Sequence, residues 1–184
     1  MYNLDWQELI PRALEYANSR RLAIDFRDRL GDGTDGAVWS TNRGSAVKLF
    51  YRIENFRDEL ECYRRLTGIE RVGKLYVPRL VDADDQHMAL EMGIIKPPRL
   101  LDFGKVHLDA PPPYWDDPGV RARFENDGKW LFREHWADVL LALSELERLG
   151  IFYVDPKPGN ILFGDEAEDP AWDAEPPLDY ESYD

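Results

Sequence analysis

The chain lacks several features that would place it in other classes of protein. It has one cysteine, Cys62, among 184 residues. It therefore cannot form an internal disulfide, which argues against a disulfide-stabilised secreted scaffold. No run of about 18 apolar residues occurs, so a membrane-spanning helix is not expected. The first eight residues lack the basic start and apolar core of a signal peptide. Together these absences favour a protein of the reducing cytoplasm.

Cations are also scarce relative to anions. The chain has 23 Lys and Arg against 36 Asp and Glu, which gives a net charge of −13. This balance disfavours nucleic acid and anionic membranes as partners. From residue 164 to the end there are nine acids and no Lys or Arg. An acidic end is usually solvated surface, although some of these carboxylates are candidate Mg²⁺ ligands. The hydrophobic content of 43% and aromatic content of 12% argue against disorder.

Residues 31–38 form a glycine-rich motif. They read G-D-G-T-D-G-A-V and place Gly31, Gly33, Gly36 and Val38 at the spacing G-x-G-x-x-G-x-V. Glycines allow backbone N–H groups to approach phosphate oxygens closely, because no Cβ obstructs them. The following residues predict a β-hairpin, whereas a dinucleotide-binding fold would continue into a helix. Taken alone, the motif fits a surface turn equally well.

Lys48 lies in the middle of the apolar strand predicted for residues 45–50. One explanation is a strand-edge lysine whose ammonium group extends to water. The other is implied by the resemblance of Ala46-Val47-Lys48 to the V-A-I-K lysine strand of protein kinases: a cation that contacts phosphates and is held by a glutamate from the next helix. Residues 53–66 predict that helix, with one apolar face. Glu59 lies beside this face and is the expected partner of Lys48, with Glu61 as the second candidate.

Residues 152–163 read F-Y-V-D-P-K-P-G-N-I-L-F and carry a further cluster of polar side chains. Asp155 could accept a hydroxyl proton, Lys157 could neutralise charge on a transferred phosphoryl group, and Asn160 could offer a neutral oxygen to Mg²⁺. These roles depend on position more than on reactive side chains. The alternative is a proline-rich turn that carries solvated charges.

The motifs occur in an order that resembles eukaryotic-type protein kinases: the glycine loop, the V-A-I-K lysine strand (here Ala46-Val47-Lys48), the glutamate helix, and the H-R-D-x-K-x-x-N catalytic loop. The resemblance implies an α+β, bilobal fold. Its N-lobe, residues 1–92, would hold an antiparallel β-sheet, one helix of the αC type and an N-terminal helix at about 4–17. Its abbreviated, mainly helical C-lobe would occupy residues 93–184.

The resemblance also implies an ATP site. Strands predicted at residues 77–82 and 87–92 would lead into a hinge, with Leu90 as the gatekeeper. The carbonyl of Glu91 and the N–H of Gly93 would meet the edge of the adenine. The apolar side chains expected around the adenine ring are Val38 and Ala46 above it and Leu162 below it.

A second metal ligand is expected after Asn160. Asp179 is the first candidate, since it follows an apolar residue and a proline pair, and Asp173 is the competitor. Residues 101–104 spell L-D-F-G, the form of the metal-binding motif of kinases. They precede the catalytic loop, whereas the kinase motif follows it. We therefore expect this segment to cover the edge of the cleft rather than to hold the metal.

The C-terminal half departs from the kinase pattern. A proline-rich connection is predicted for residues 110–119 and one long helix for residues 130–149. Tyr153 and Val154 stand where His and Arg are usual. The resemblance ends near residue 181 and includes no activation segment or peptide-binding helices. A partner protein or a dimer is therefore a candidate source of the acceptor surface.

Three functions are compatible with these patterns. The first is an ATP-binding serine/threonine-protein-kinase-like protein that performs Mg²⁺-dependent phosphoryl transfer to an unidentified acceptor. The second is a pseudokinase that senses nucleotide or acts as a scaffold without transfer. The third is an acidic interaction protein that uses no nucleotide. Nucleotide binding separates the third from the others, and turnover separates the first from the second.

Overall fold

The computed structural model describes residues 5–164, so the predictions for Asp173 and Asp179 lie outside the described residues. The described chain begins with a 3₁₀ turn, η1 (Trp6–Leu9), and helix α1 (Ile10–Arg20). Pro11 lies in the first turn of α1, where an N–H has no helical partner to lose. The N-terminal helix expected at about residues 4–17 is therefore a 3₁₀ turn followed by a helix that begins at Ile10, next to this proline, and ends at Arg20.

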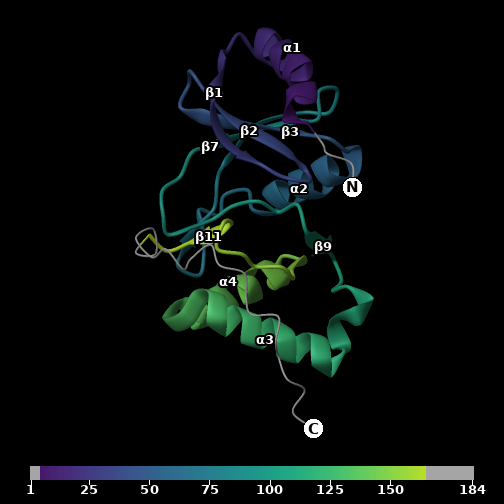
Figure 1. Cartoon of the computed structure of the whole chain (residues 1–184), viewed down its shortest axis with the longest axis vertical. Helices are drawn as coiled ribbons and strands as arrows, with labels where there is room; N and C mark the ends of the chain where they lie inside the picture. Colours follow the sequence, from purple (N-terminus) through teal and green to yellow (C-terminus); the bar gives the residue numbers. More distant parts are fainter. Residues whose placement is uncertain (1–4, 165–184) are drawn as a thin grey trace.

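The upper part of the molecule is a five-stranded antiparallel sheet in the order β1-β2-β3-β7-β6 (Figure 1). Its strands are β1 (Ile24–Asp32), β2 (Gly36–Thr41), β3 (Ser45–Phe50), β6 (Leu80–Asp84) and β7 (Ala89–Gly93). The central strand β3 is buried at every position because helices cover both faces of the sheet. Val47 and Leu49 belong to the core beneath α1, whereas Ala46 and Phe50 belong to the core beside α2.

Helix α2 (Ile53–Arg65) confirms the helix predicted from the apolar spacing. Phe56, Leu60 and Tyr63 face the core. Glu59 is buried with them, and its side chain therefore needs a polar partner. The face of α2 that covers the sheet is thus also the face that presents this carboxylate.

The lower part of the molecule holds α3 (Pro118–Phe132), a 3₁₀ turn η3 (Arg133–His135) and α4 (Trp136–Arg148). The prediction of one helix over residues 130–149 was wrong. Arg133 has a φ of 47° and a ψ of −122°, a non-helical conformation that ends α3 and redirects the chain. A Cβ at Gly128 would lie 2.2 Å from the Trp136 ring, so α3 packs closely on the start of α4.

The connection before α3 is also more regular than expected. It contains the 3₁₀ turn η2 (Pro113–Asp116), and α3 begins at Pro118, inside the segment predicted to be a loop. The side chain of Asp117 accepts hydrogen bonds from the N–H groups of Gly119 and Val120. An aspartate cap followed by proline is a standard start signal for a helix, and it was present in the sequence.

Two small sheets connect the upper and lower parts. One has the order β11-β8-β5-β4, and the other pairs β10 with β9. Their strands are β4 (Arg71–Val72), β5 (Leu75–Tyr76), β8 (Arg99–Leu100), β9 (Val106–Leu108), β10 (Ile151–Tyr153) and β11 (Ile161–Leu162). The pairs β8–β11 and β9–β10 bring residues near 100 beside residues 152–163, the segment that resembles the catalytic loop of kinases and is called the catalytic loop below.

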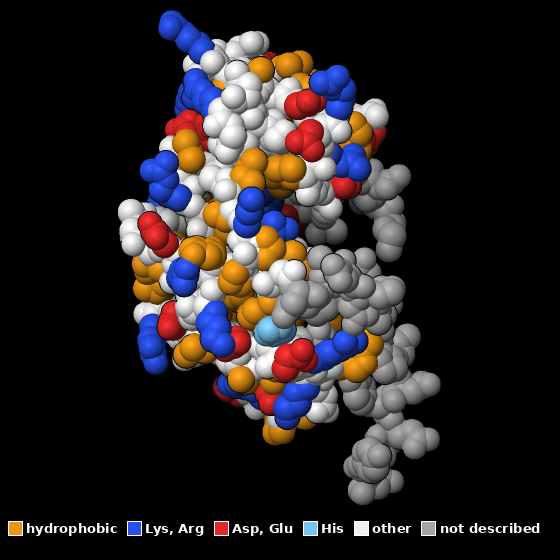
Figure 2. Space-filling model, turned by 90° about the vertical axis from the view of Figure 1, so that its left-hand side faces the viewer, with side chains coloured by type: hydrophobic (Ala, Val, Ile, Leu, Met, Phe, Trp, Pro, Cys, Tyr) orange, Lys and Arg blue, Asp and Glu red, His pale blue; other side chains and the backbone are white. Residues whose placement is uncertain are grey.

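The described chain has an α+β fold in two parts. The antiparallel sheet with α1 and α2 lies above, and α3 and α4 lie below (Figure 1). The lobe boundary near residue 92 stays a prediction; strands β4 and β5 precede it in the chain but pair with β8. No helix within residues 5–164 has the length and apolar character needed to cross a bilayer. On the face shown in Figure 2, cationic, anionic and apolar side chains are interspersed.

Candidate active site

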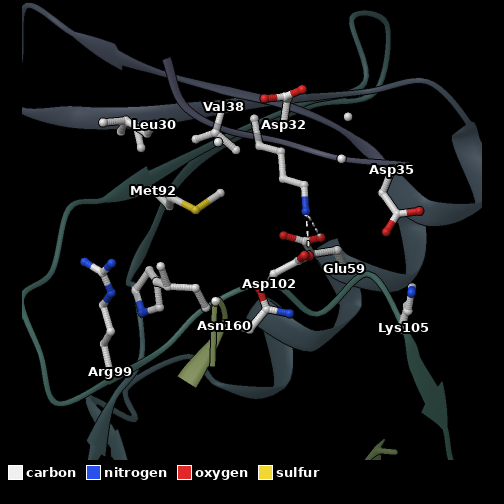
Figure 3. Close-up of a pocket in the computed structure, with 18 of the residues that line it drawn as sticks. Leu30, Asp32, Asp35, Val38, Glu59, Met92, Arg99, Asp102, Lys105 and Asn160 are labelled. Atoms are coloured by element: carbon white, nitrogen blue, oxygen red, sulfur yellow. Dashed lines mark hydrogen bonds and ion pairs between the residues drawn. The ribbon is translucent and has the colours of Figure 1, made fainter. Parts of the chain in front are cut away.

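A cleft of about 510 Å³ lies between the sheet and the segments that precede and contain the catalytic loop (Figure 3). Most of the residues predicted to form the site line it. They are Gly31, Gly33, Gly36, Val38, Ala46, Lys48, Glu59, Gly93, Asp155, Lys157 and Asn160. Leu90, Glu91 and Leu162 were also expected there but do not line it.

Lys48 and Glu59 form the ion pair expected from the sequence. The Nζ atom of Lys48 lies 2.7 Å from Oε2 of Glu59, and both side chains are buried, at 7% and 1% exposure. The alternative of a lysine that reaches water is therefore wrong. Glu61, the second candidate partner, instead forms ion pairs with Arg64 and Arg65 on the outer side of α2.

Asp102 is a second partner of Lys48 that sequence reasoning did not foresee. Its Oδ1 atom lies 2.8 Å from Lys48 Nζ and also accepts a hydrogen bond of 3.0 Å from the N–H of Gly104. Figure 3 shows Asp102 and Glu59 converging on the lysine from below. The expectation that residues 101–104 merely cover the cleft edge is therefore corrected: this turn carries a carboxylate into the cleft.

The neighbouring Phe103 anchors the turn. It is fully buried, and its ring meets Tyr63 and Tyr153 edge to face, with centroids 5.4 and 6.1 Å apart. Tyr63 comes from α2 and Tyr153 from β10, so Phe103 joins the upper helix to the start of the catalytic loop. This aromatic column fixes the position of Asp102.

Strand pairing explains how Asp102 reaches the site from an early position in the chain. Strand β8 ends at Leu100, which pairs with Ile161 of β11, and the N–H of Leu101 donates to the carbonyl of Asn160 over 2.7 Å. Asp102 follows immediately. Chain order was the reason for discounting residues 101–104, but sheet pairing, not chain order, decides which side chains meet.

The two carboxylates beside Lys48 have different environments. Burial raises the pKa of the Glu59 carboxyl to about 7, although the Lys48 ammonium acts in the opposite direction. Burial also acts to raise the pKa of Asp102, but the charge of Lys48 and the hydrogen bonds to it outweigh burial and hold that pKa below its usual value. Burial acts to lower the pKa of Lys48, and the two carboxylates more than reverse this effect. Lys48 is therefore a charged group in a largely dry site.

The catalytic loop contributes Asp155, Lys157 and Asn160 to the lining of the cleft. Oδ2 of Asp155 lies 3.2 Å from Nζ of Lys157 and 3.5 Å from Nζ of Lys105. Lys105 belongs to the segment before β9 and was missed by sequence reasoning, because no motif assigns a role to that position. The loop emerges from β10 and closes with a hydrogen bond of 2.9 Å from the N–H of Asn160 to the carbonyl of Lys157.

The glycine loop forms the roof. A Cβ at Gly36 would lie 1.9 Å from the carbonyl oxygen of Leu49, so this position requires glycine. Asp35 directs its carboxylate downward, where a Cβ at Gly104 would lie 2.4 Å from its Oδ2 atom. Asn55 donates to Asp35 over 2.5 Å. Burial raises the pKa of the Asp35 carboxyl, and the charge of Lys48 opposes this rise.

The wall opposite the catalytic loop differs from the expected hinge. Leu90 pairs with Lys48 in the sheet and is fully buried, whereas Met92 lines the cleft. The N–H of Gly93 donates to the carbonyl of Arg79 over 2.9 Å, so sheet pairing already uses the group expected to meet adenine. The wall is continued by Ile94 and Ile95.

Glu91 is buried within the upper part of the molecule and does not line the cleft. Its buried carboxylate accepts hydrogen bonds from the hydroxyl of Tyr16 over 3.1 Å and from the hydroxyl of Ser45 over 2.5 Å. It therefore fastens α1 to the sheet. Leu162 likewise lies in β11 outside the cleft, and Leu101 lines the floor in its place.

The chain has no significant match among protein-family models or among the curated proteins. Eleven chains of solved structures match it. The ADP-bound aminoglycoside phosphotransferase APH(2'')-Ib is 17% identical, with a TM-score of 0.36 over 67% of this chain and 39% of that chain. The streptomycin–ATP–APH(2'')-IIa ternary complex is also 17% identical, with a TM-score of 0.36 over 72% and 41%.

The gentamicin–APH(2'')-IIa complex is 18% identical, with a TM-score of 0.37 over 81% of this chain and 56% of that chain. The chain thus spans less than two thirds of the length of each of these structures. Similarities at these values are too weak to support a function, so the function is argued from the geometry of the cleft.

Proposed function

We propose that the cleft binds ATP with Mg²⁺ and transfers its terminal phosphoryl group to a hydroxyl-bearing acceptor, so that the chain acts as a kinase-like phosphotransferase. The observation that carries the proposal is convergence. The buried Lys48–Glu59 pair, the glycine loop and the polar residues of the catalytic loop come from separate parts of the chain and line one cleft. Phosphoryl transfer relies chiefly on positioning and charge, which this arrangement supplies.

The adenine ring would occupy the apolar end of the cleft. Val38 and Ala46 would cover it from above, and Leu101 would support it from below. The wall from Met92 to Ile95 would meet the edge of the ring, in place of Leu90 and Glu91. Lys48 would then contact the inner phosphates, while the backbone of the glycine loop would close over them.

Asp102 and Asn160 are the residues that would hold Mg²⁺. Both line the cleft (Figure 3), and the N–H of Leu101, the residue before Asp102, donates to the carbonyl of Asn160. A carboxylate with an amide oxygen is a hard-oxygen donor set that suits this ion. No group of three His, Cys, Asp or Glu residues within residues 5–164 is arranged to hold a metal, so phosphate oxygens and water would complete the shell. Mg²⁺ would supply positive charge beside the phosphates. Asp179 and Asp173 remain alternative ligands.

In the transfer step, the acceptor oxygen would form a bond to the terminal phosphorus. The bond from that phosphorus to the bridging oxygen would break, and the electron pair would leave with ADP. Asp155 would orient the acceptor hydroxyl and take its proton. Lys157, 3.2 Å from Asp155, would stabilise negative charge on the transferred group. The kinase resemblance points to a serine or threonine hydroxyl as acceptor, with a partner protein or a second copy supplying it.

A nucleotide-sensing module without transfer is the second candidate. The observation that favours it is the double pairing of Lys48: its ammonium already donates to both Glu59 and Asp102, which leaves one of its three N–H groups for a phosphate. Binding alone would be enough for this function, and turnover separates the two candidates.

The deciding experiment measures ADP formation from Mg·ATP by the native protein and by Asp155→Asn. We expect slow turnover by the native protein and a loss of about 100-fold or more in the variant, the usual size of a general-base contribution. Asp85→Asn is the matched control, since Asp85 is exposed and does not line the cleft. ATP binding with no turnover in either protein would favour the sensing module.

A further inference from the structure

The catalytic aspartate has two lysine neighbours, and only one belongs to the catalytic loop. Lys157 lies 3.2 Å and Lys105 3.5 Å from the same oxygen, Oδ2 of Asp155. Both line the cleft, and their side chains are 54% and 60% exposed. Exposed ion pairs of this kind are weak, so either ammonium can exchange Asp155 for a stronger anionic partner.

The fold holds Lys105 at this place through its backbone. Lys105 directly precedes β9, whose Val106 pairs with Tyr153 in β10, two residues before Asp155. On its other side, Gly104 donates its N–H to Asp102. The same turn therefore sets the positions of Asp102 and of Lys105.

Figure 3 shows where the ammonium group points. Lys105 lies beyond Asp102 at one end of the cleft, below Asp35 of the glycine loop, and its side chain rises toward that roof. The charge of Lys105 also counters the rise in the pKa of Asp35, which places the two groups within electrostatic reach. Lys105 is thus a cation between the roof and Asp155.

The charge distribution of the cleft indicates what this cation binds. The charged lining residues are Asp32, Asp35, Glu59, Asp102 and Asp155, against Lys48, Arg99, Lys105 and Lys157. Lys48 is already engaged by two carboxylates, and Arg99 contacts the carbonyl of Ile95 on the opposite wall. At the end of the cleft where Asp155 lies, Lys105 and Lys157 are the cations that the described lining offers to a polyanion.

We propose that Lys105 binds the terminal phosphate of the nucleotide, opposite Lys157, and that this contact frees Asp155 to face the acceptor. The inference rests on the proposed function of the cleft. A phosphate offers Lys105 several charged oxygens, whereas Asp155 offers one oxygen at 3.5 Å. A nucleoside diphosphate lacks the phosphate concerned. Lys105 should therefore favour ATP over ADP, unlike Lys48, which contacts the phosphates that both nucleotides share.

The test is calorimetric titration of ATP and of ADP, each with Mg²⁺, into the native protein and into Lys105→Ala and Lys105→Arg. We expect Lys105→Ala to weaken ATP binding roughly tenfold, as for loss of one charged hydrogen bond, and to leave ADP binding unchanged. Lys105→Arg should keep most of the ATP affinity. Lys129→Ala is the matched control, because Lys129 is 61% exposed, pairs with one carboxylate and lies outside the cleft.

Three results would overturn the inference. If Lys105→Ala weakens ATP and ADP equally, Lys105 acts on a shared part of the nucleotide or on the fold. If it changes neither affinity, Lys105 makes no contact with nucleotide while the proposed function stands. If the native protein binds neither nucleotide, the proposed function fails and the role of Lys105 fails with it.

Discussion

The carboxylate of Asp102 lies 2.8 Å from the ammonium of Lys48, although 54 residues separate them in the chain. Glu59 contacts the same ammonium, at 2.7 Å. Asp102 reaches this position through the pairing of β8 with β11, which sets residues 101–104 directly beside the catalytic loop. The cleft therefore brings together Lys48, Glu59, Asp102 and Asn160 from four separate segments.

The first prediction concerns Asp102 as a metal ligand. In the native protein, replacing Mg²⁺ with EDTA should weaken ATP binding, because phosphate and Asp102 then repel each other. The ratio of the ATP dissociation constants measured with EDTA and with Mg²⁺ should be roughly tenfold smaller in Asp102→Asn, since the site loses its charged oxygen ligand. Titration of ATP with and without EDTA measures both values, with Asp85→Asn as the control. If ATP binding by Asp102→Asn depended on Mg²⁺ as strongly as binding by the native protein, the metal ligand would be Asp179 or Asp173 instead of Asp102.

The second prediction concerns the stability of the Lys48 cluster. Lys48→Ala leaves Glu59 buried without its cation, and it should lower the free energy of unfolding by about 3–5 kcal/mol. Glu59→Ala should cost less, because Asp102 still pairs with Lys48 at 2.8 Å. Urea unfolding measures both, and Lys74→Ala, which breaks a surface pair with Asp138, should cost under about 1 kcal/mol. Equal losses for Lys48→Ala and Glu59→Ala would contradict the role of Asp102.

The third prediction distinguishes the glycines of the loop. Gly36→Ala forces a Cβ to within 1.9 Å of the Leu49 carbonyl, so β2 and β3 must separate locally. We expect a loss of about 1–3 kcal/mol in stability, as for other overpacked sites. A Cβ at Gly31 would have no atom within 4 Å, so the melting temperature of Gly31→Ala should be close to that of the native protein. Thermal unfolding followed by circular dichroism compares the two, and a Gly36→Ala variant as stable as Gly31→Ala would disprove the packing argument.

The fourth prediction concerns Cys62, the one cysteine of the chain. It is fully buried in α2, and burial raises the pKa of its thiol well above the usual value. The native protein should therefore react with a thiol reagent such as dithionitrobenzoate at least about 100-fold more slowly than the urea-unfolded chain, since only the thiolate attacks. Rapid labelling of the folded protein at pH 8 would show that α2 does not cover this side chain.

Local patterns in the sequence, together with the kinase resemblance, were enough to predict the Lys48–Glu59 pair. A lysine within an apolar strand needs a partner, and the apolar spacing of the next helix identifies which glutamate faces it. The sequence was not enough to predict the place of Asp102, because the pairing of β8 with β11 is a long-range contact that no local spacing reports. Lys105 was missed for the same reason, since the β9–β10 register positions it.

The errors at the cleft wall and in the lower helices have different causes. Glu91 was expected near the adenine, yet its carboxylate is used to fasten α1 through Tyr16, a tertiary contact outside the kinase pattern. The break at Arg133 depends on the packing of Gly128 against Trp136, which apolar spacing cannot reveal. The start of α3 at Pro118 was predictable, because Asp117 and Pro118 form a capping signal.

The central claim is that the cleft binds Mg·ATP through Lys48, and a melting experiment tests it most directly. The melting temperature is measured with and without Mg·ATP for the native protein and for Lys48→Ala, each relative to its own ligand-free value. ATP at 100 times its dissociation constant should stabilise the native protein by about 2.7 kcal/mol, and the variant should show little of this shift. No shift in the native protein, or an equal shift in both proteins, would contradict the account.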